Sequence, residues 1–272
     1  DEGRASYRWL NHGDRAEAPL VRENGSLVAS DWDHALARAA QIVKGSSGQA
    51  AVIASPNASN EALYLLATLT GDFDSARAFS VRRVPGEQPL AGVPNLALRE
   101  ERAANASGAR LFGFEERFHD VLTVAAEASL VVVLDDPLEG VGGGARNGLG
   151  QGMGYFIYIG TTLPQAARDA DVVLPIANVA EEDGTFLNRD MRVQRYFQAK
   201  TPPGMARPAW WVLGELLAEL GKGQALQSAA EVFDTLAQAV GAFSGLDYAM
   251  LHTVGAQAAD REPAGAGAEA VG

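Results

Sequence analysis

Two uninterrupted apolar runs, AAVIA at residues 50–54 and LVVVL at residues 130–134, constrain the fold more than any other feature of the sequence. Short continuous runs of this kind are typical of strands that are buried on both faces. A sheet buried on both faces needs helices to cover it. The two runs therefore predict an α/β domain.

Helical patterns flank the first run on both sides. Residues 30–44 begin with a Ser-Asp pair that can cap free amides, and their apolar residues recur at helical spacing. After the run, Ser59 or Asn60 caps a second helix with leucines along one side. Helix, strand and helix in succession predict a mainly parallel sheet flanked by helices.

The remaining elements follow from the same patterns. A segment rich in Pro, Gly and Arg, residues 71–118, is expected to be mostly loop. We expect further helices at residues 119–126, 164–170, 210–220 and 229–240, and further strands at residues 155–159, 172–174 and, once or twice, within 185–199.

Domain organisation is predicted from these elements. Residues 30–255 form one α/β domain, residues 1–29 are a leading segment before it, and residues 256–272 are a flexible tail rich in Ala and Gly. Length is compatible with a full hydrophobic core, because a chain of 272 residues can bury about three quarters of its unfolded surface.

Composition excludes several classes of site and partner. A formal net charge of −12 disfavours non-specific binding to nucleic acid or anionic lipid. The chain has no Cys, which excludes disulfides, thiolate metal sites and Cys-held iron–sulfur clusters within it. No apolar run approaches the ~20 residues of a membrane helix, so direct membrane insertion is not expected.

Polar residues follow the second apolar run at the edge where α/β sheets bind ligands. Asp135 and Asp136 stand at the carboxyl end of this predicted strand. Residues 140–154, which include GVGGGA, could cradle a phosphate of a nucleotide. No P-loop Lys and no helical run follow, so a mobile loop is the favoured interpretation.

Metal ligands and exposed cations are weaker candidates. None of the four His has metal-ligand spacing with another, so we expect no metal site. Arg82, Arg83, Arg189, Arg192 and Arg195 form basic spots that could bind phosphate or carboxylate groups. Pairing with the many carboxylates of the chain is the favoured interpretation.

The stretch DADVVLPIANVAEEDGTFLNRDMRVQ, residues 169–194, concentrates polar groups behind a short predicted strand. Gly184 ends an acidic turn, where we expect a positive φ. Thr185, Asn188, Arg192 and Gln194 follow with donors and acceptors. They could hold a large polar ligand, or they could satisfy the backbone of their own loop.

This stretch resembles the C-terminal signature of the molybdopterin oxidoreductase superfamily, which reads Ala-Asp-Val-Val-Leu-Pro, Glu-x-x-Gly-Thr-x-x-Asn and Arg-x-Gln. Three further pieces agree in order: DEGR, SDWDHAL and SPNASNEALYLL at residues 1–4, 30–36 and 55–66. The resemblance implies a compact fold of this superfamily. It marks Asn60, Thr185, Asn188 and Arg192 as residues of a pterin site or its relict.

Within the superfamily, the nearest likeness is to the large iron–sulfur subunit of NADH-quinone oxidoreductase, complex I. It rests on YRWLN after DEGR and on ARPAWWVLGELL after the signature. The likeness implies a scaffold without its own cofactor or catalytic residue, supporting electron transfer from NADH to quinone. Iron–sulfur clusters would lie upstream, and other peripheral-arm subunits at the cytoplasmic side of the membrane would be partners.

The sequence also departs from the superfamily pattern. Residues 75–155 are shorter than the corresponding layers of molybdenum enzymes, and Met191 stands where a second glycine is usual. These departures favour a scaffold that keeps the shape of a site without its ligand. Two alternatives stay open: a compact molybdopterin-dependent oxidoreductase of the formate dehydrogenase kind, and a module that binds a nucleotide at the glycine loop.

Overall fold

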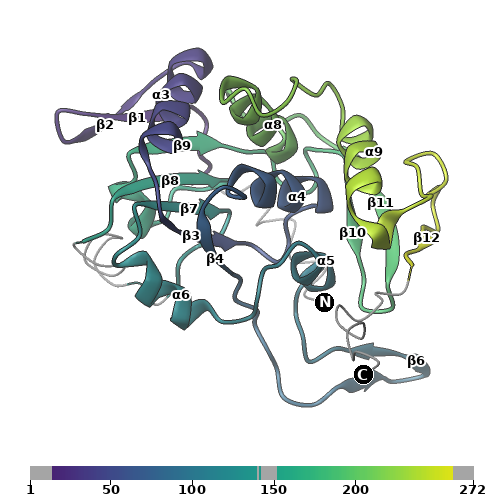
Figure 1. Ribbon diagram of the computed structural model, residues 1–272. Coiled ribbons are helices and arrows are strands. Elements are labelled where there is room, and N and C mark those ends of the chain that lie inside the picture. Colours follow the sequence, from purple (N-terminus) through teal and green to yellow (C-terminus); the bar gives the residue numbers. More distant parts are fainter. Residues whose placement is uncertain (1–13, 140, 142–151, 260–272) are drawn as a thin grey trace, which may run out of the picture.

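The computed structural model describes residues 14–139, 141 and 152–259 (Figure 1). Its centre is a seven-stranded sheet in the order β2-β1-β9-β8-β7-β3-β4. The five strands from β9 to β4 run parallel, and β1 is antiparallel to both of its neighbours, β9 and β2. The predicted α/β class with a mainly parallel sheet is therefore confirmed.

The parallel strands are the predicted apolar runs. Their bounds are β3 Gln49–Ala54, β4 Asp74–Ala78, β7 Leu130–Leu134, β8 Tyr155–Gly160 and β9 Val172–Pro175. The chain passes from β3 to β4 on one side, and then to β7, β8 and β9 on the other side of β3. The order of strands thus reverses between β3 and β7, which is the position where open α/β sheets bind ligands.

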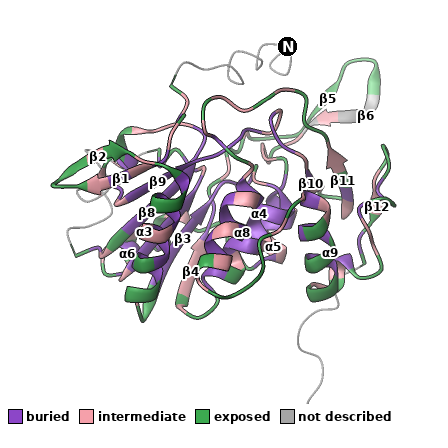
Figure 2. Ribbon diagram, turned by 90° about the horizontal axis from the view of Figure 1, so that it is seen from above, coloured by how far each residue is buried: buried purple, intermediate pink, exposed green. Residues whose placement is uncertain are grey.

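Helices cover both faces of this sheet (Figure 1). On one face lie α3 (Trp32–Gly45), α4 (Asn60–Leu69) and α8 (Ala209–Glu219), and on the other lies α6 (Phe118–Ala125). Along β3, Val52 packs in the first core and Ile53 in the second. The prediction that this strand is buried on both faces is confirmed, as the inner strands in Figure 2 show.

Both helix starts near the first apolar run match their predicted caps. Asp31 accepts a hydrogen bond from the His34 amide at the start of α3. Ser59, rather than Asn60, caps α4 by accepting from the Ala62 amide. Each cap satisfies an amide that has no partner inside the helix.

A smaller antiparallel sheet packs beside α4. It consists of β10 (Gly184–Leu187), β11 (Arg192–Tyr196) and β12 (Ala256–Gln257), in that order. The helices α9 (Ala229–Ala239) and η2 (Gly241–Phe243) lie next to it and contribute to the first core. Of the one or two strands expected within residues 185–199, two are present, as β10 and β11.

Residues 71–118 lie mostly outside helices and strands, as expected, but they hold more regular structure than the sequence indicated. They contain β4, a two-stranded hairpin of β5 (Gln88–Leu90) and β6 (Val93–Leu98), and α5 (Ala106–Leu111). Strand β4 has the sequence DSARA and lies at the edge of the sheet, where polar side chains meet water. It lacks an apolar run for this reason, and pairing with β3 makes it a strand.

The ends of the predicted domain also differ from its structural limits. Residues 20–29, within the leading segment, form β1 (Leu20–Glu23) and β2 (Ser26–Ala29), and β1 pairs with β9 of the main sheet. At the other end, β12 pairs with β11. Residues 1–13, 260–272 and most of the glycine stretch at 140–154 lie outside the described residues.

One smaller difference concerns a helix, and a separate finding concerns membrane spans. The helix expected at residues 164–170 is a short 3₁₀ helix, η1 (Gln165–Asp169), beginning after Pro164. Within the described ranges, no helix has both the length and the apolar character that a membrane crossing requires.

Candidate functional site

A pocket of about 460 Å³ opens at the carboxyl ends of β3, β7, β8 and β9, at the point where the strand order reverses. Its volume lies within the ~300–1,000 Å³ that small-molecule sites occupy. Its polar lining consists of hydroxyl, amide and carboxyl groups, and three aromatic rings line it too. These side chains come from Ser55, Asn57, Ser59, Asp135, Tyr158, Thr161, Thr162, Asn178, Glu182, Phe186 and Tyr196.

Asp135 stands at the end of β7 in a backbone conformation that is rare outside glycine, with φ 48°. Its Oδ1 accepts hydrogen bonds from the amide and hydroxyl of Thr161, at 2.7 and 2.8 Å. Its Oδ2 has no hydrogen-bond partner among the described residues. Burial raises the pKa of Asp135 to about 6, so at neutral pH it is mainly a carboxylate acceptor.

Backbone strain continues after Asp135. Leu138, which is buried, has φ 54°, and its amide donates to Oδ1 of Asp136 at 2.8 Å. Non-glycine residues in this region each carry an energetic cost, and such residues cluster at ligand sites. The loop after β7 is therefore held in its shape by specific hydrogen bonds beside the pocket.

Glu182 forms another part of the pocket wall. Its Oε1 accepts from the Tyr196 hydroxyl, and its Oε2 accepts from the Ala209 amide at the start of α8, both at 2.9 Å. Burial, with smaller contributions from the carboxyl groups of Glu61 and Asp135, raises the pKa of Glu182 to about 8. A carboxyl group that is protonated near neutral pH thus lines the pocket.

Stability is expected to fall between pH 4.5 and about 8 because of Glu182. Below this window the side chain is protonated in both states. Within it, the unfolded chain loses the proton while the folded chain keeps it, which favours unfolding by roughly 1.4 kcal/mol per pH unit. Glu182→Gln should match the wild type near the lower limit and be more stable above the upper one, as measured by denaturant unfolding at a series of pH values. Equal stability at high pH would contradict this.

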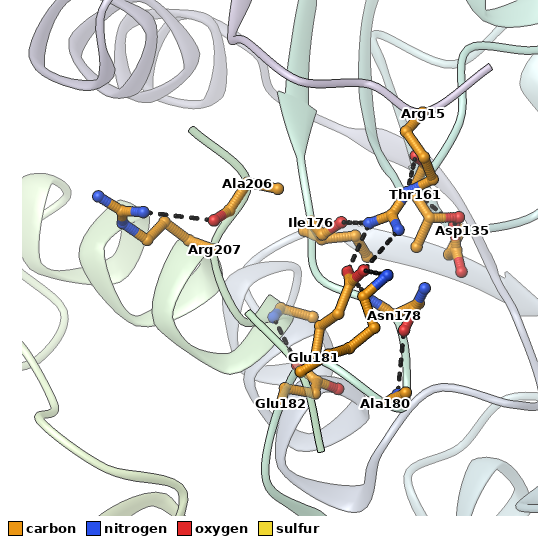
Figure 3. A network of polar contacts seen from close by, with 12 residues as sticks. Arg15, Asp135, Thr161, Ile176, Asn178, Ala180, Glu181, Glu182, Ala206 and Arg207 are labelled. Carbon is orange, nitrogen blue, oxygen red and sulfur yellow. Dashed lines mark hydrogen bonds and ion pairs between the residues drawn. The ribbon is translucent and has the colours of Figure 1, made fainter. Parts of the chain in front are cut away.

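An ion pair lies beside the pocket and is hydrogen-bonded to residues that line it (Figure 3). The Arg15 guanidinium binds both carboxylate oxygens of Glu181 at 2.8 and 2.7 Å, and it also donates to the carbonyls of Thr161 and Ile176. The Glu181 side chain is fully buried, and it also accepts from Lys200 and the Asn178 amide. Burial alone raises a carboxyl pKa, but these partners hold the pKa of Glu181 below its ordinary value.

Two of the four predicted pterin-site residues come together behind the pocket. The Asn60 side-chain amide donates to the Thr185 hydroxyl at 3.0 Å, and the amide and hydroxyl of Thr185 both donate to Glu61 at 2.9 Å. All three side chains are buried. Burial raises the pKa of Glu61 to about 7. This network ties the first turn of α4 to β10.

The other two predicted residues lie at the far turn of the β10–β11 hairpin. Oδ1 of Asn188 accepts from the amides of Asp190 and Arg192, both at 2.9 Å. The Arg192 guanidinium donates to the Gly255 carbonyl at 3.1 Å. The structure does not bring this pair to Asn60 and Thr185, and none of the four lines the pocket.

Gly184 does not have the positive φ that the sequence suggested, because it begins β10 as an ordinary strand residue. Its lack of a side chain serves another purpose. A Cβ at this position would lie 2.5 Å from the Tyr196 hydroxyl oxygen. Gly184 therefore makes room for the chain's own tyrosine rather than for close approach of a ligand to the backbone.

Several residues of this site were not identified from the sequence. Arg15 lies in the leading segment, and its partner Glu181 is 166 positions away. The sequence pattern indicates only a strand at Tyr196 and only an acidic turn at Glu182. A signal existed only for Asp135, which directly follows a buried strand. The other roles depend on contacts between distant parts of the chain.

The basic residues of the sequence are largely engaged within the chain. Arg83 pairs with Glu116 at 2.6 Å and Arg189 with Glu87 at 2.7 Å, as the favoured interpretation predicted. Arg195 lies over the rings of Phe197 and Tyr248. Among the described residues, no group of three or more His, Cys, Asp and Glu side chains could hold a metal ion.

The family model that matches the chain is molybdopterin oxidoreductase, over residues 151–219. An F420-dependent formate dehydrogenase 2 subunit alpha from Methanococcus maripaludis is 39% identical over 105 residues, covering 38% of this chain and 16% of that protein. An F420-dependent formate dehydrogenase subunit alpha from Methanocaldococcus jannaschii is 36% identical over 91 residues, covering 33% of this chain and 14% of that protein.

Among solved structures, acetylene hydratase from Pelobacter acetylenicus gives a TM-score of 0.36 and 15% identity, covering 48% of this chain and 19% of that chain. This likeness is too low to support an argument about the fold. The matches to the two curated proteins span only about a sixth of their length. Residues 151–219 are thus similar to part of a molybdopterin oxidoreductase domain, and the homologues of the chain are formate dehydrogenase-like.

Proposed function

We propose that this chain is the cofactor-binding α/β part of a molybdopterin-dependent oxidoreductase of the formate dehydrogenase-like kind. One observation carries the proposal. The pocket at the reversal of strand order is built largely from the segment that matches the molybdopterin oxidoreductase family, from Tyr158 to Ala209. A family segment and a ligand site of the type that α/β sheets form thus coincide.

The pocket fits one arm of a pterin cofactor better than a complete pair of pterins. Its volume of about 460 Å³ suits one heteroaromatic ring system with its attached polar groups. Tyr196 fills the space in front of Gly184, and Tyr158 fills the space in front of Gly160. These tyrosines occupy room that a second ring system would need.

The polar lining supports binding of rings and hydroxyl groups. Oδ2 of Asp135 can accept from a ring N–H or a sugar hydroxyl, while Asn57 and Asn178 offer amide groups. No Lys or Arg is among the described lining residues, so the pocket offers no cationic side chain to a phosphate and is better suited to neutral polar groups. When bound, the molybdenum of the cofactor would supply two-electron redox chemistry. The residues here bind and orient it.

A metal and pterin assay on the native full-length protein tests this proposal. We expect molybdenum or tungsten together with pterin. A variant that fills the pocket, Ala58→Phe, should lose the pterin, because Ala58 lines the pocket at the turn before α4. The matched control Ala29→Phe, on exposed β2, should keep it. Native protein without pterin, or equal pterin in both variants, would contradict the proposal.

A second candidate is a scaffold domain in the iron–sulfur subunit of an NADH:quinone oxidoreductase. The observation that favours it is that each of the residues Asn60, Thr185, Asn188 and Arg192 makes a hydrogen bond within the chain. Under this candidate, electrons pass through iron–sulfur clusters upstream. The partners are peripheral-arm subunits on the cytoplasmic side of the membrane. The same assay would then find iron without molybdenum, tungsten or pterin.

A further inference from the structure

Four hydroxyl and carboxyl groups stand side by side at one wall of the pocket. Glu182, Tyr196 and Ser59 line it, and Glu61 lies behind them in the first turn of α4. Glu182 contacts Tyr196 at 2.9 Å, and Ser59 interacts with both Tyr196 and Glu61. Because each group can donate or accept depending on its neighbour, the position of one proton affects what the wall offers to a ligand.

The two hydrogen bonds of Glu182 determine which way the Tyr196 hydroxyl donates. Its Oε2 always accepts, because the partner is the backbone amide of Ala209. When Glu182 is ionised, its Oε1 accepts a hydrogen bond from the Tyr196 hydroxyl. The phenol oxygen can then act only as an acceptor toward a ligand. When Glu182 is protonated at Oε1, it donates to the phenol oxygen. The hydroxyl hydrogen of Tyr196 then has to point away from Glu182.

We propose that Glu182 and Tyr196 select a ligand that presents a neutral hydrogen-bond acceptor to this wall, because protonated Glu182 turns the Tyr196 hydroxyl into a donor toward the pocket. The inference rests on the proposed function only in taking the pocket as a ligand site. Both residues act by positioning a proton, and neither needs to react.

The surroundings of Glu182 favour its protonated form. The groups that face it are Tyr196 from β11, Glu61 from α4, Asp135 from the end of β7 and the Ala209 amide from α8. Two of these carry carboxyl groups and none carries a positive charge. Consistent with this, the pKa of Glu182 is raised to about 8, and that of Tyr196 lies well above its ordinary value. The phenol therefore keeps its proton throughout the titration of Glu182.

The walls of the pocket indicate the chemistry of the acceptor. Phe186 and Tyr196 present rings whose centroids lie 4.7 Å apart, and Tyr158 adds a third ring. Flat apolar surfaces of this kind pack well against a heteroaromatic ring. Nearby carboxyl groups repel a dianionic phosphate. A ring carbonyl oxygen meets both conditions, since it accepts a hydrogen bond and carries no net charge.

The first test needs no ligand and uses the full chain with ¹³C labels at the Glu carboxyl carbon and the Tyr phenolic carbon. We expect the Glu182 signal to titrate near pH 8 and the Tyr196 signal to move with the same midpoint. Spectra of Glu182→Gln and Tyr196→Phe assign the two signals, and the Tyr196 movement should vanish in Glu182→Gln. A Glu182 midpoint near pH 4.5, or a Tyr196 signal that does not change when Glu182 titrates, would overturn the inference.

The second test measures binding of 1-methylinosine, which has a ring carbonyl, against purine riboside, which lacks it. At about pH 6.5 we expect the carbonyl compound to bind about tenfold more tightly to the wild type, and this preference should disappear at about pH 9.5. The Gln side chain in Glu182→Gln can still donate to the phenol oxygen, so the preference should persist at both pH values. Tyr196→Phe should show none.

The outcomes separate this inference from the proposed function. If neither nucleoside binds at about pH 6.5, or if the wild-type preference does not change with pH, the selection by Glu182 and Tyr196 is wrong. The metal and pterin assay then still decides whether the pocket holds the cofactor. Conversely, the native protein could lack pterin and still prefer the carbonyl compound in a pH-dependent way. That result would contradict the proposed function and support the selection of an acceptor by Glu182 and Tyr196.

Discussion

Replacing Arg15 by Ala should lower the free energy of unfolding by about 3–5 kcal/mol, because it leaves a buried carboxylate without its main partner. The Glu181 side chain has no exposed surface, and Arg15 donates one short hydrogen bond to each of its two oxygens, which leaves the Asn178 amide and Lys200 as the other partners. Lys200, at 3.2 Å and partly exposed, remains as a weaker partner. The loss includes the bonds that Arg15 donates to the carbonyls of Thr161 and Ile176.

The matched control is an ion pair at the surface. Arg99 and Glu87 are bridged at 2.8 Å, but both side chains are about two-fifths exposed, at 39% and 42%. Arg99→Ala should therefore cost less than about 1 kcal/mol. Equilibrium denaturant unfolding of the wild type and both variants measures the difference. If the two variants lose equal stability, the Arg15–Glu181 pair is not the buried clamp that its geometry indicates.

A third variant separates the charge from the packing. The double change Arg15→Met, Glu181→Leu removes both charges and puts apolar side chains in their place. Replacement of a buried pair in this way is often close to neutral, whereas removal of one partner is costly. We therefore expect the double variant to be more stable than Arg15→Ala. A double variant as unstable as the single one would show that the backbone bonds of Arg15 dominate.

The sequence was sufficient for those parts of the fold that depend on neighbouring residues. The runs at residues 50–54 and 130–134 became β3 and β7 because each residue in them packs against a helix on one face or the other. The cap of α3 was also readable, since Asp31 meets an amide only three positions away. The order of the strands could not be predicted from the sequence, because it depends on which distant strands β4 and β1 pair with.

The residues of the candidate site also divide into those that the sequence could predict and those that it could not. Asp135 could be found because it directly follows a buried strand, at the edge where such sheets bind ligands. Glu182 could not, since its pKa depends on burial by Tyr196, Glu61 and α8, which are far from it in sequence. Thr185 and Asn188, which the resemblance marked as pterin-site residues, make hydrogen bonds within the chain. Polar residues in a motif can serve the backbone as well as a ligand.

Replacing Leu174 by Ala should lower the free energy of unfolding by about 2–5 kcal/mol through lost burial and the cavity left behind. Leu174 has no exposed surface and packs in the core beneath α3. It lies in β9, which pairs with β8 on one side and with β1 on the other, so the strand has little freedom to collapse into the space.

The consequences of this change should reach the pocket, because β9 leads directly into Ile176 and Asn178, which line it. The control is Val28→Ala on β2, whose side chain is 45% exposed and whose loss should cost less than about 1 kcal/mol. Denaturant unfolding gives both values. A loss below about 1 kcal/mol for Leu174→Ala would mean that β9 is not held between β8 and β1 in solution. The pocket would then lack the rigid edge on which its selectivity depends.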